Sequence, residues 1–276
     1  MRWTKRGFLV GIVLFFILGI WGNITSLKAS SLPLDSLMVY LSFDDPDNPV
    51  TDETGNLASF VVNGDLFSVP GIKNNGLLFP LDGRSYFYSY NDFRWPTTSF
   101  TIAGWAKPYT LDTDGIGWLG FVTKDEAFNL EFKNGRGHTR LRKPDGYYWY
   151  DQYFTPEAMV ENNVFHFVTV TFDGQTLTFY KDSLQVGQIT LDFSTDLSKI
   201  SPLTVGLDKF GSQNYFEGVM DELTLWSVAL SEEEIKTLYL SKGDPYASPV
   251  PLPESLYLLL SGLGCVVWGC KRFAKS

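Results

Sequence analysis

The stretch that decides the fold is Phe165–Tyr180, which reads FHFVTVTFDGQTLTFY. Apolar and polar residues alternate along both halves, as they do in strands with one buried face. Between the halves lies Asp173-Gly174, a dipeptide suited to a two-residue turn that needs positive φ. A second turn leads to a further run containing Val186 and Ile189. The pattern predicts a three-stranded antiparallel meander.

Similar short apolar runs, separated by Gly, Asp, Asn and Pro, recur on both sides of this meander. The further strands that we expect span residues 38–43, 76–79, 86–88, 100–107, 120–123, 128–133, 203–207 and 218–226. Many short strands at such spacing favour two packed antiparallel sheets over an α/β fold. The sequence therefore predicts an all-β sandwich.

One short helix is expected near the end of this body. Ser231 and Glu234 form a capping box, in which each side chain bonds the backbone of the other residue. Ile235, Leu238 and Tyr239 would then share the inward face. Gly243 is a plausible stop.

The N-terminal residues 1–31 have the layout of a secretory signal peptide. Arg2, Lys5 and Arg6 precede an uncharged apolar stretch, residues 7–22, and a small polar segment follows. An uncleaved anchor is the alternative. By the positive-inside rule the basic residues stay cytoplasmic, which places the body outside the cell.

The C-terminal end has a proline-rich linker, residues 245–255, and then an apolar segment with a basic tail, residues 256–276. The 14 apolar residues 256–269 would span about 21 Å as a helix, short of a ~30 Å hydrocarbon core. The segment resembles PEP-CTERM sorting tags, although Ser255 stands where that family usually has a second proline. The resemblance implies an exosortase-type processing protease and transient membrane anchoring at the surface of a Gram-negative-type bacterium. An ordinary membrane tail is the alternative.

The body between these ends is strongly acidic. Residues 29–253 carry 30 acidic and 15 basic side chains, a net charge of −15. Such a surface repels polyanions, so nucleic acid is excluded as a natural partner. Both cysteines, Cys265 and Cys270, lie in the C-terminal apolar segment, so no disulfide supports the body.

The body resembles laminin-G-like domains of the concanavalin A-like superfamily over about residues 37–240. The segments that carry the resemblance are 41–45, 52–56, 71–79, 100–108, 167–174 and 216–226, followed by the capped helix. The resemblance implies a single jelly-roll domain, residues 32–244, and often a role in binding glycans or proteins. It does not fix the ligand.

The resemblance also implies a structural calcium ion, because in the family the first and last strands lie side by side. Carried over to this chain, its ligands are Asp44, Asp52 and Asp221, and the crowded acids of residues 44–48 fit oxygen coordination. The alternative is that these are turn residues. Strand alternation would point Asp221 and Glu222 to opposite faces of the sheet.

A glycan platform is expected around residues 147–150, where Tyr147 and Trp149 would share one strand face. Flat aromatic rings stack on sugar C–H faces, and Arg140 and Arg142 just before them would suit anionic sugars. Burial of these rings in the core is the alternative. A second aromatic group spans residues 86–95.

No catalytic residues are expected. The paired-carboxylate motif of related glycanases is missing, His166 has the parity of a core residue, and His138 is expected exposed in a Gly-rich loop. We therefore expect a secreted, non-catalytic protein that binds extracellular polysaccharide or surface glycan. The alternative is a polysaccharide-degrading hydrolase or lyase of the same fold, favoured if carboxylates or a His–Tyr pair converge on one sheet. A matrix protein with protein partners is a third reading.

Overall fold

The computed structural model describes residues 31–81, 84–111, 117–125, 127–143, 149–155, 157, 159–208 and 214–247, with only the backbone of Trp149. The expected signal peptide, the sorting signature with its apolar tail, and Tyr147 lie outside the described residues. No helix in the described part of the chain is long and apolar enough to cross a membrane.

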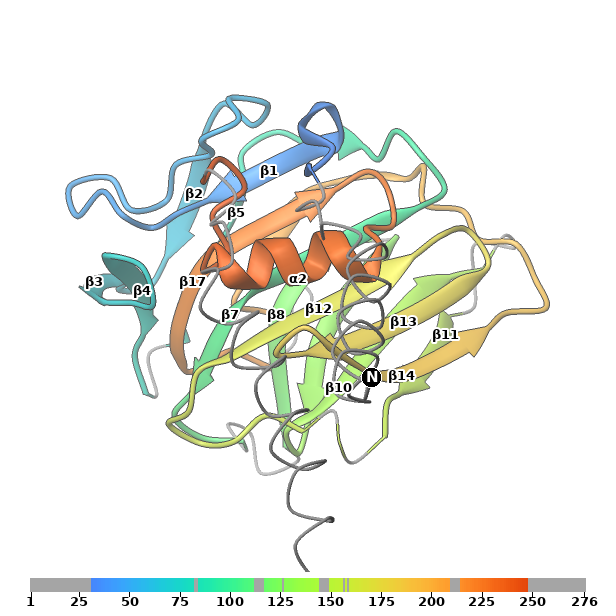
Figure 1. Ribbon diagram of the computed structural model, residues 1–276. Coiled ribbons are helices and arrows are strands. Elements are labelled where there is room, and N and C mark those ends of the chain that lie inside the picture. The colour runs from blue at the N-terminus through green and yellow to red at the C-terminus, as the bar shows by residue number, and fades with distance from the viewer. Residues whose placement is uncertain are drawn as a thin grey trace, which may run out of the picture. The chain divides into compact units, whose positions relative to one another are not determined.

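The first of two large sheets has eight strands (Figure 1). Its order is β14 (Leu184–Thr190), β13 (Thr176–Lys181), β12 (His166–Phe172), β7 (Phe100–Pro108), β17 (Gly218–Trp226), β4 (Asn75–Phe79) and β3 (Phe67–Pro70), with β1 (Leu37–Leu41) also paired to β17. The predicted meander forms β12, β13 and β14. The first and last strands of the body lie side by side, as expected.

The second sheet has seven strands. Its order is β11 (Trp149–Tyr153), β10 (Arg136–Arg142), β9 (Phe128–Lys133), β8 (Trp118–Lys124), β16 (Leu203–Val205), β5 (Tyr86–Ser89) and β2 (Phe60–Asn63). A short two-stranded sheet pairs β6 (Phe93–Arg94) with β15 (Ile200–Ser201), and a 3-10 turn, η2, spans Leu34–Ser36. The described strand pairs are antiparallel, which confirms the predicted all-β sandwich.

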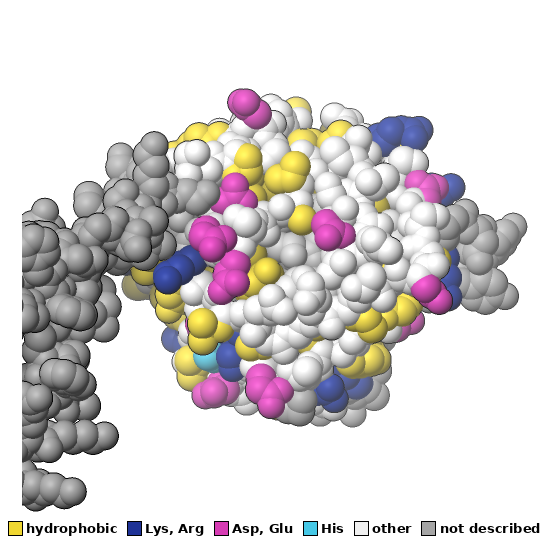
Figure 2. Space-filling view, turned by 45° about the vertical axis from the view of Figure 1, so that its right-hand side comes forward, with side chains coloured by type: hydrophobic (Ala, Val, Ile, Leu, Met, Phe, Trp, Pro, Cys, Tyr) yellow, Lys and Arg dark blue, Asp and Glu magenta, His cyan; other side chains and the backbone are white. Residues whose placement is uncertain are grey.

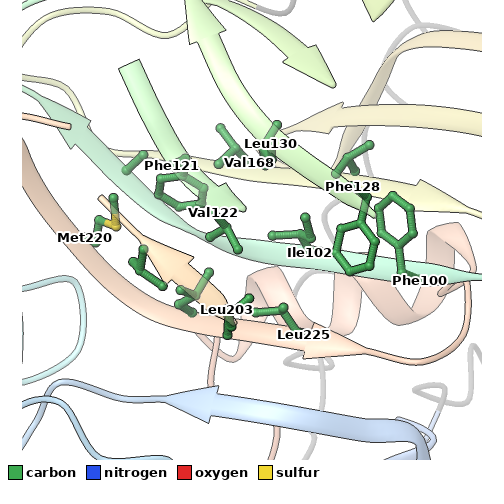
Figure 3. Close-up of a cluster of buried hydrophobic side chains, with 14 of the residues drawn as sticks. Phe100, Ile102, Phe121, Val122, Phe128, Leu130, Val168, Leu203, Met220 and Leu225 are labelled. Atoms are coloured by element: carbon green, nitrogen blue, oxygen red, sulfur yellow. The ribbon is translucent and has the colours of Figure 1, made fainter. Parts of the chain in front are cut away.

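The core lies between the two sheets (Figure 3). Phe100 of β7 stacks on Phe128 of β9 with ring centroids 4.1 Å apart, so the two sheets are joined through aromatic contact. Burying one such side chain stabilises the fold by about 1.5–3 kcal/mol. Because alternate residues of each strand fill this core, the residues between them must face outward.

The outer face of the eight-stranded sheet is covered by helix α2 (Glu232–Leu240), as Figure 1 shows. Ser231 caps the helix through the predicted capping box, and buried Ile235 and Leu238 pack in one cluster with Trp105 and Trp226. Among the described residues α2 is the only α-helix, and none of them forms a helix over the outer face of the seven-stranded sheet.

The expectation of an exposed His138 in a Gly-rich loop is wrong. The turn is confined to Asn134 and Gly135, which have positive φ, and strand β10 begins at Arg136. Gly137 is a strand residue at which a side chain would not fit, because a Cβ there would lie 2.6 Å from the Phe179 ring. His138 is therefore a fully buried strand residue.

Candidate functional site

Charged side chains gather on the outer face of the seven-stranded sheet, at strands β9, β10 and β11. Leu130 and Phe132 of β9 point into the core, so Glu131 between them points outward. His138 is paired with Glu131 on β9 and with Tyr153 on β11, so these three residues share the outer face.

His138 lies between a buried acid, Glu131, and a half-exposed acid, Asp151. Its Nδ1 lies 2.7 Å from Glu131 Oε1 and its Nε2 lies 3.5 Å from Asp151 Oδ1. The imidazole packs against the rings of Trp118 and Tyr153, at centroid distances of 4.9 and 4.3 Å. Burial alone would lower the pKa of His138, but bonding to Asp151 and Glu131 outweighs it, so this pKa is raised.

Arg140 is the cation at the centre of the cluster. Its Nη2 donates to both carboxylate oxygens of Glu131, at 2.9 and 3.0 Å, and also contacts Asp208. Its Nε lies 3.9 Å from Asp151 Oδ1. One guanidinium therefore bonds two buried acids and approaches a third.

The pKa values of the two buried acids move in opposite directions. Burial raises the pKa of Glu131, and the bond with His138 only partly offsets this. Burial would also raise the pKa of Asp208, but its bond with Glu131 and the charge of Arg140 outweigh burial and lower it. Glu131 therefore keeps a proton more readily, and Asp208 remains a carboxylate.

A cleft of about 540 Å³ opens over this cluster. It is lined by Trp118, Arg140, Asp151, Tyr153, Asp208 and Asn214. Asp208 forms part of the floor, since its side chain is nearly buried and accepts from Asn129 and Asn214. Asp151 and Tyr153 form the rim, with 51% of the Asp151 side chain and 43% of Tyr153 exposed. The cleft thus combines accessible rings with fixed polar groups.

The described residues include part of the predicted glycan platform. Arg140 lines the cleft, Arg142 follows on the same face of β10, and Trp149 stands opposite Arg142 in the β10–β11 register. Sequence reasoning missed Trp118, Glu131 and Asp208. The alternation of strand 128–133 predicts that Glu131 faces away from the core, whereas Trp118 and Asp208 come near it only in the folded structure.

The second aromatic group, residues 86–95, is divided between surface and core. Tyr86 and Tyr88 stack at a centroid distance of 6.3 Å on the outer face of β5, and Tyr86 also contacts Tyr215. Trp95 is instead 1% exposed within the core and donates its indole N–H to the Ser99 carbonyl.

A second charged cluster surrounds Lys73, beside strands β1, β4 and β17. The Lys73 ammonium lies 3.7 Å from Asp44, 3.3 Å from Glu222 and 3.0 Å from Asp244. The expectation that Asp221 and Glu222 diverge is wrong. A bulge with positive φ at Glu222 interrupts the alternation, so Asp221 bonds the Lys73 amide while Glu222 reaches its ammonium.

Asp221 has a feature that suits a cation, whereas both carboxylate oxygens of Asp44 already accept hydrogen bonds from Asn74 and Asn75. Asp221 Oδ2 accepts from the amides of Ile72 and Lys73, but the buried Oδ1 has no hydrogen-bond partner. Burial, reinforced by the nearby charge of Asp44, raises the pKa of Asp221 to about 7. Burial likewise raises the pKa of Glu222 to about 8. Negative charge is under-compensated here.

Asp52 does not suit the same role. Its oxygens accept from the amides of Tyr40, Thr54 and Leu57 and from the Thr54 hydroxyl, which is the bonding of a turn-forming aspartate. Within the described ranges no three His, Cys, Asp or Glu side chains form a metal-binding group. A calcium ion would therefore depend on Asp44, Asp221 and backbone oxygens.

Fold and cleft together define a lectin-like β-sandwich. Residues 81–236 match the sequence model of the Laminin_G_3 family, described as the concanavalin A-like lectin/glucanases superfamily. The chain belongs to this family. A search of curated proteins finds no sequence match.

Solved structures share this fold. The binding domain of Paraclostridial Mosquitocidal Protein 1 matches with a TM-score of 0.61 and 18% identity, over 75% of this chain and 52% of that one. Domain 4 of AbnA, an extracellular arabinanase of Geobacillus stearothermophilus in complex with arabinotriose, gives 0.59 and 17%, over 74% and 98%. The binding domain of botulinum neurotoxin DC in complex with SialylT gives 0.56 and 16%, over 75% and 51%. This chain thus spans about half of either toxin domain, and at these identities the likeness establishes the fold alone.

Proposed function

We propose that this protein is a secreted, non-catalytic carbohydrate-binding protein that binds extracellular polysaccharide or surface glycan in the cleft over Arg140. The observation that carries the proposal is the pairing of accessible Trp118 and Tyr153 rings with fixed polar groups on the sheet face that α2 leaves open. Sugar rings stack on aromatic faces while their hydroxyls bond carboxylates and amides.

The comparisons with solved structures support a binding role in general. The similar toxin structures are binding domains, and the arabinanase domain was solved in complex with arabinotriose. Figure 2 shows acidic side chains spread over one face of the molecule with basic ones interspersed, which suits partners other than polyanions.

A polysaccharide-binding screen that also records new reducing ends tests the proposal. We expect binding without turnover, and weaker binding by Trp118→Ala and Tyr153→Ala variants that unfold like the parent. Glu232→Gln, on the exposed side of α2, is the control. Unchanged binding by both cleft variants would contradict this placement of the site.

A polysaccharide-degrading enzyme is the second candidate, because His138 and Tyr153 converge beside carboxylates on one sheet. His138 and Glu131 are fully buried, so the groups available to a substrate are Asp151 and Tyr153. Release of reducing ends that is lost in Tyr153→Phe or Asp151→Asn would favour the enzyme over the binding protein.

The proposed location of the protein is the cell surface of a Gram-negative-type bacterium. Residues 1–31 would direct export, and the C-terminal segment would hold the protein in the membrane until an exosortase-type protease acts. Deleting residues 249–276 should redirect the protein to free secretion. Unchanged surface retention would contradict the sorting role.

A structural calcium ion is proposed at Asp44 and Asp221. The unpartnered Asp221 Oδ1 and the under-compensated charge around it support the ion, while Asp52 supports the neighbouring turn instead. Such an ion would stabilise the body and leave the cleft to bind glycan.

A further inference from the structure

Three tyrosines, Tyr86, Tyr88 and Tyr215, gather outside the cleft over Arg140. Phe87 between the first two is fully buried in the core, so Tyr86 and Tyr88 point outward from β5. Their ring centroids lie 6.3 Å apart with 25° between the ring planes, and the Tyr215 ring lies 6.2 Å from Tyr86. All three residues are half-buried. They form one partly exposed aromatic surface, which we call the tyrosine patch.

The tyrosine patch and the cleft lie on the same face of the seven-stranded sheet. Tyr88 is paired with Thr204 of β16, which is paired with Thr123 of β8. Thr123 is in turn paired with Asn129 of β9. Residues paired across neighbouring strands point to the same side of a sheet. The Asn129 side chain donates to the cleft residue Asp208 at 3.2 Å, so this side is the one on which the cleft opens.

Asn214 and Tyr215 connect the cleft with the patch. Asn214 lines the cleft, and its carbonyl accepts from the Gly120 amide of β8 at 3.0 Å. A Cβ at Gly120 would lie 2.7 Å from that carbonyl oxygen, so the glycine lets the Asn214 backbone lie directly on the sheet. The next residue, Tyr215, contacts Tyr86. The aromatic surface therefore continues from the wall of the cleft to β5.

The two aromatic groups are too far apart for one sugar ring. In the sheet order β16 separates β5 from β8, the strand that carries Trp118. At about 4.8 Å between neighbouring strands, the backbones of Tyr86 and Trp118 are at least about 10 Å apart. A single ring cannot stack on both side chains, whereas a chain of linked sugar units can.

Resting on the proposed carbohydrate-binding function, we propose that the tyrosine patch is a second sugar-stacking subsite, and that one polysaccharide chain binds from Trp118 to Tyr86. The ligand class is thus a chain long enough for different units to occupy both subsites. Phenol rings stack on sugar C–H faces, and their hydroxyls both donate and accept hydrogen bonds. Binding at the second subsite is intramolecular once the first is occupied, so the two contributions reinforce each other.

A series of ligand lengths tests the proposal. Binding of the purified protein is measured to arabino-, xylo- and malto-oligosaccharides from disaccharide to octasaccharide, and to the parent polymers. In every series that binds, we expect the affinity to rise by about tenfold or more between trisaccharide and octasaccharide.

Variants locate the second subsite. Tyr86→Leu keeps apolar volume but removes a flat face, and it should weaken octasaccharide binding by about two- to tenfold while trisaccharide binding in the cleft is unchanged. Tyr215→Leu is the second variant of the patch. Tyr246→Leu, at an exposed tyrosine that contacts Tyr40 instead, is the control and should change neither affinity. Urea unfolding checks that each variant is folded.

The outcomes separate the two proposals. An affinity that does not rise with length, or octasaccharide binding that is unchanged in Tyr86→Leu and Tyr215→Leu, overturns the second subsite and leaves carbohydrate binding in the cleft standing. Equal weakening at every length has the same consequence. Binding to none of the oligosaccharides and polymers overturns the carbohydrate-binding function itself, and the second subsite with it.

Discussion

Two cationic side chains of this protein, Arg140 and Lys73, each lie among three acids, with different electrostatic results. Arg140 is bonded to Glu131 and Asp208, and the pKa of Asp208 falls while that of Glu131 rises. Lys73 approaches its acids as a single point charge, and the pKa values of Glu222 and Asp221 rise to about 8 and about 7. A planar guanidinium can satisfy several carboxylate oxygens at once, whereas an ammonium does not fix them in the same way.

The difference assigns the two clusters different roles. The side chains of the Arg140 cluster are held by hydrogen bonds to one another, so the cluster can hold a cleft rim in place for a ligand. The Lys73 cluster retains uncompensated negative charge and an unpartnered buried oxygen, so its stability should respond to protons and cations.

Replacing Arg140 with Met is expected to have the largest effect. It leaves buried Glu131 and Asp208 without their cation, and breaking such a pair costs about 3–5 kcal/mol of unfolding free energy. Urea unfolding measures the loss, and Arg142→Met on the same strand is the control with a smaller expected loss. A loss below about 1 kcal/mol would mean that the cluster does not depend on the guanidinium.

Calcium should stabilise the protein through the Lys73 cluster alone. An ion at 100 times its dissociation constant adds about 2.7 kcal/mol to the folded state. We expect millimolar calcium to raise Tm at pH 8 for the parent and for Asp52→Asn, but not for Asp221→Asn. Loss of the shift in Asp52→Asn with retention in Asp221→Asn would reverse the ligand assignment.

The Lys73 cluster should also make stability fall as pH rises. The raised pKa values of Glu222 and Asp221 mean that the folded protein binds more protons than the unfolded chain between about pH 4.5 and about 8. Their contribution is complete below the unfolded pKa values and is lost as pH rises through the folded ones, by on the order of 1 kcal/mol per pH unit. Unfolding in chelator at several pH values measures this slope, which Glu222→Gln should flatten. An equal slope in that variant would contradict the assignment.

The smallest effect on stability is expected from Trp149→Ala. Its place opposite Arg142 at the end of β11 predicts about two- to tenfold weaker glycan binding, because one stacked ring contributes about 0.5–1.5 kcal/mol. Binding and unfolding are measured together, with Trp95→Ala as the core control that should lose stability. A comparable collapse of Trp149→Ala would place that ring in the core instead.

Sequence alone predicted the sheets well because buried strands leave a period of two. The strand 128–133 and the meander from His166 to Thr190 were expected from alternation and turn residues. The prediction from sequence was wrong at β10, where the glycines suggested a loop. Gly137 is instead a strand residue whose missing side chain leaves room for the Phe179 ring. Local composition does not reveal that a glycine is required by the packing of a side chain distant in sequence.

The sequence by itself determined the all-β class, the capped helix, the acidic surface and the approach of the first and last strands, because these follow from periodicity, capping chemistry, charge and family pattern. Only the tertiary structure decided which acids share a cation. Glu131 and His138 meet Arg140 through the register of the consecutive strands β9 and β10, whereas Asp208 comes from a segment 68 residues further along the chain. The bulge at Glu222 turns two neighbouring acids toward Lys73. Strand register and one irregular backbone position set these contacts, and neither is encoded in local alternation.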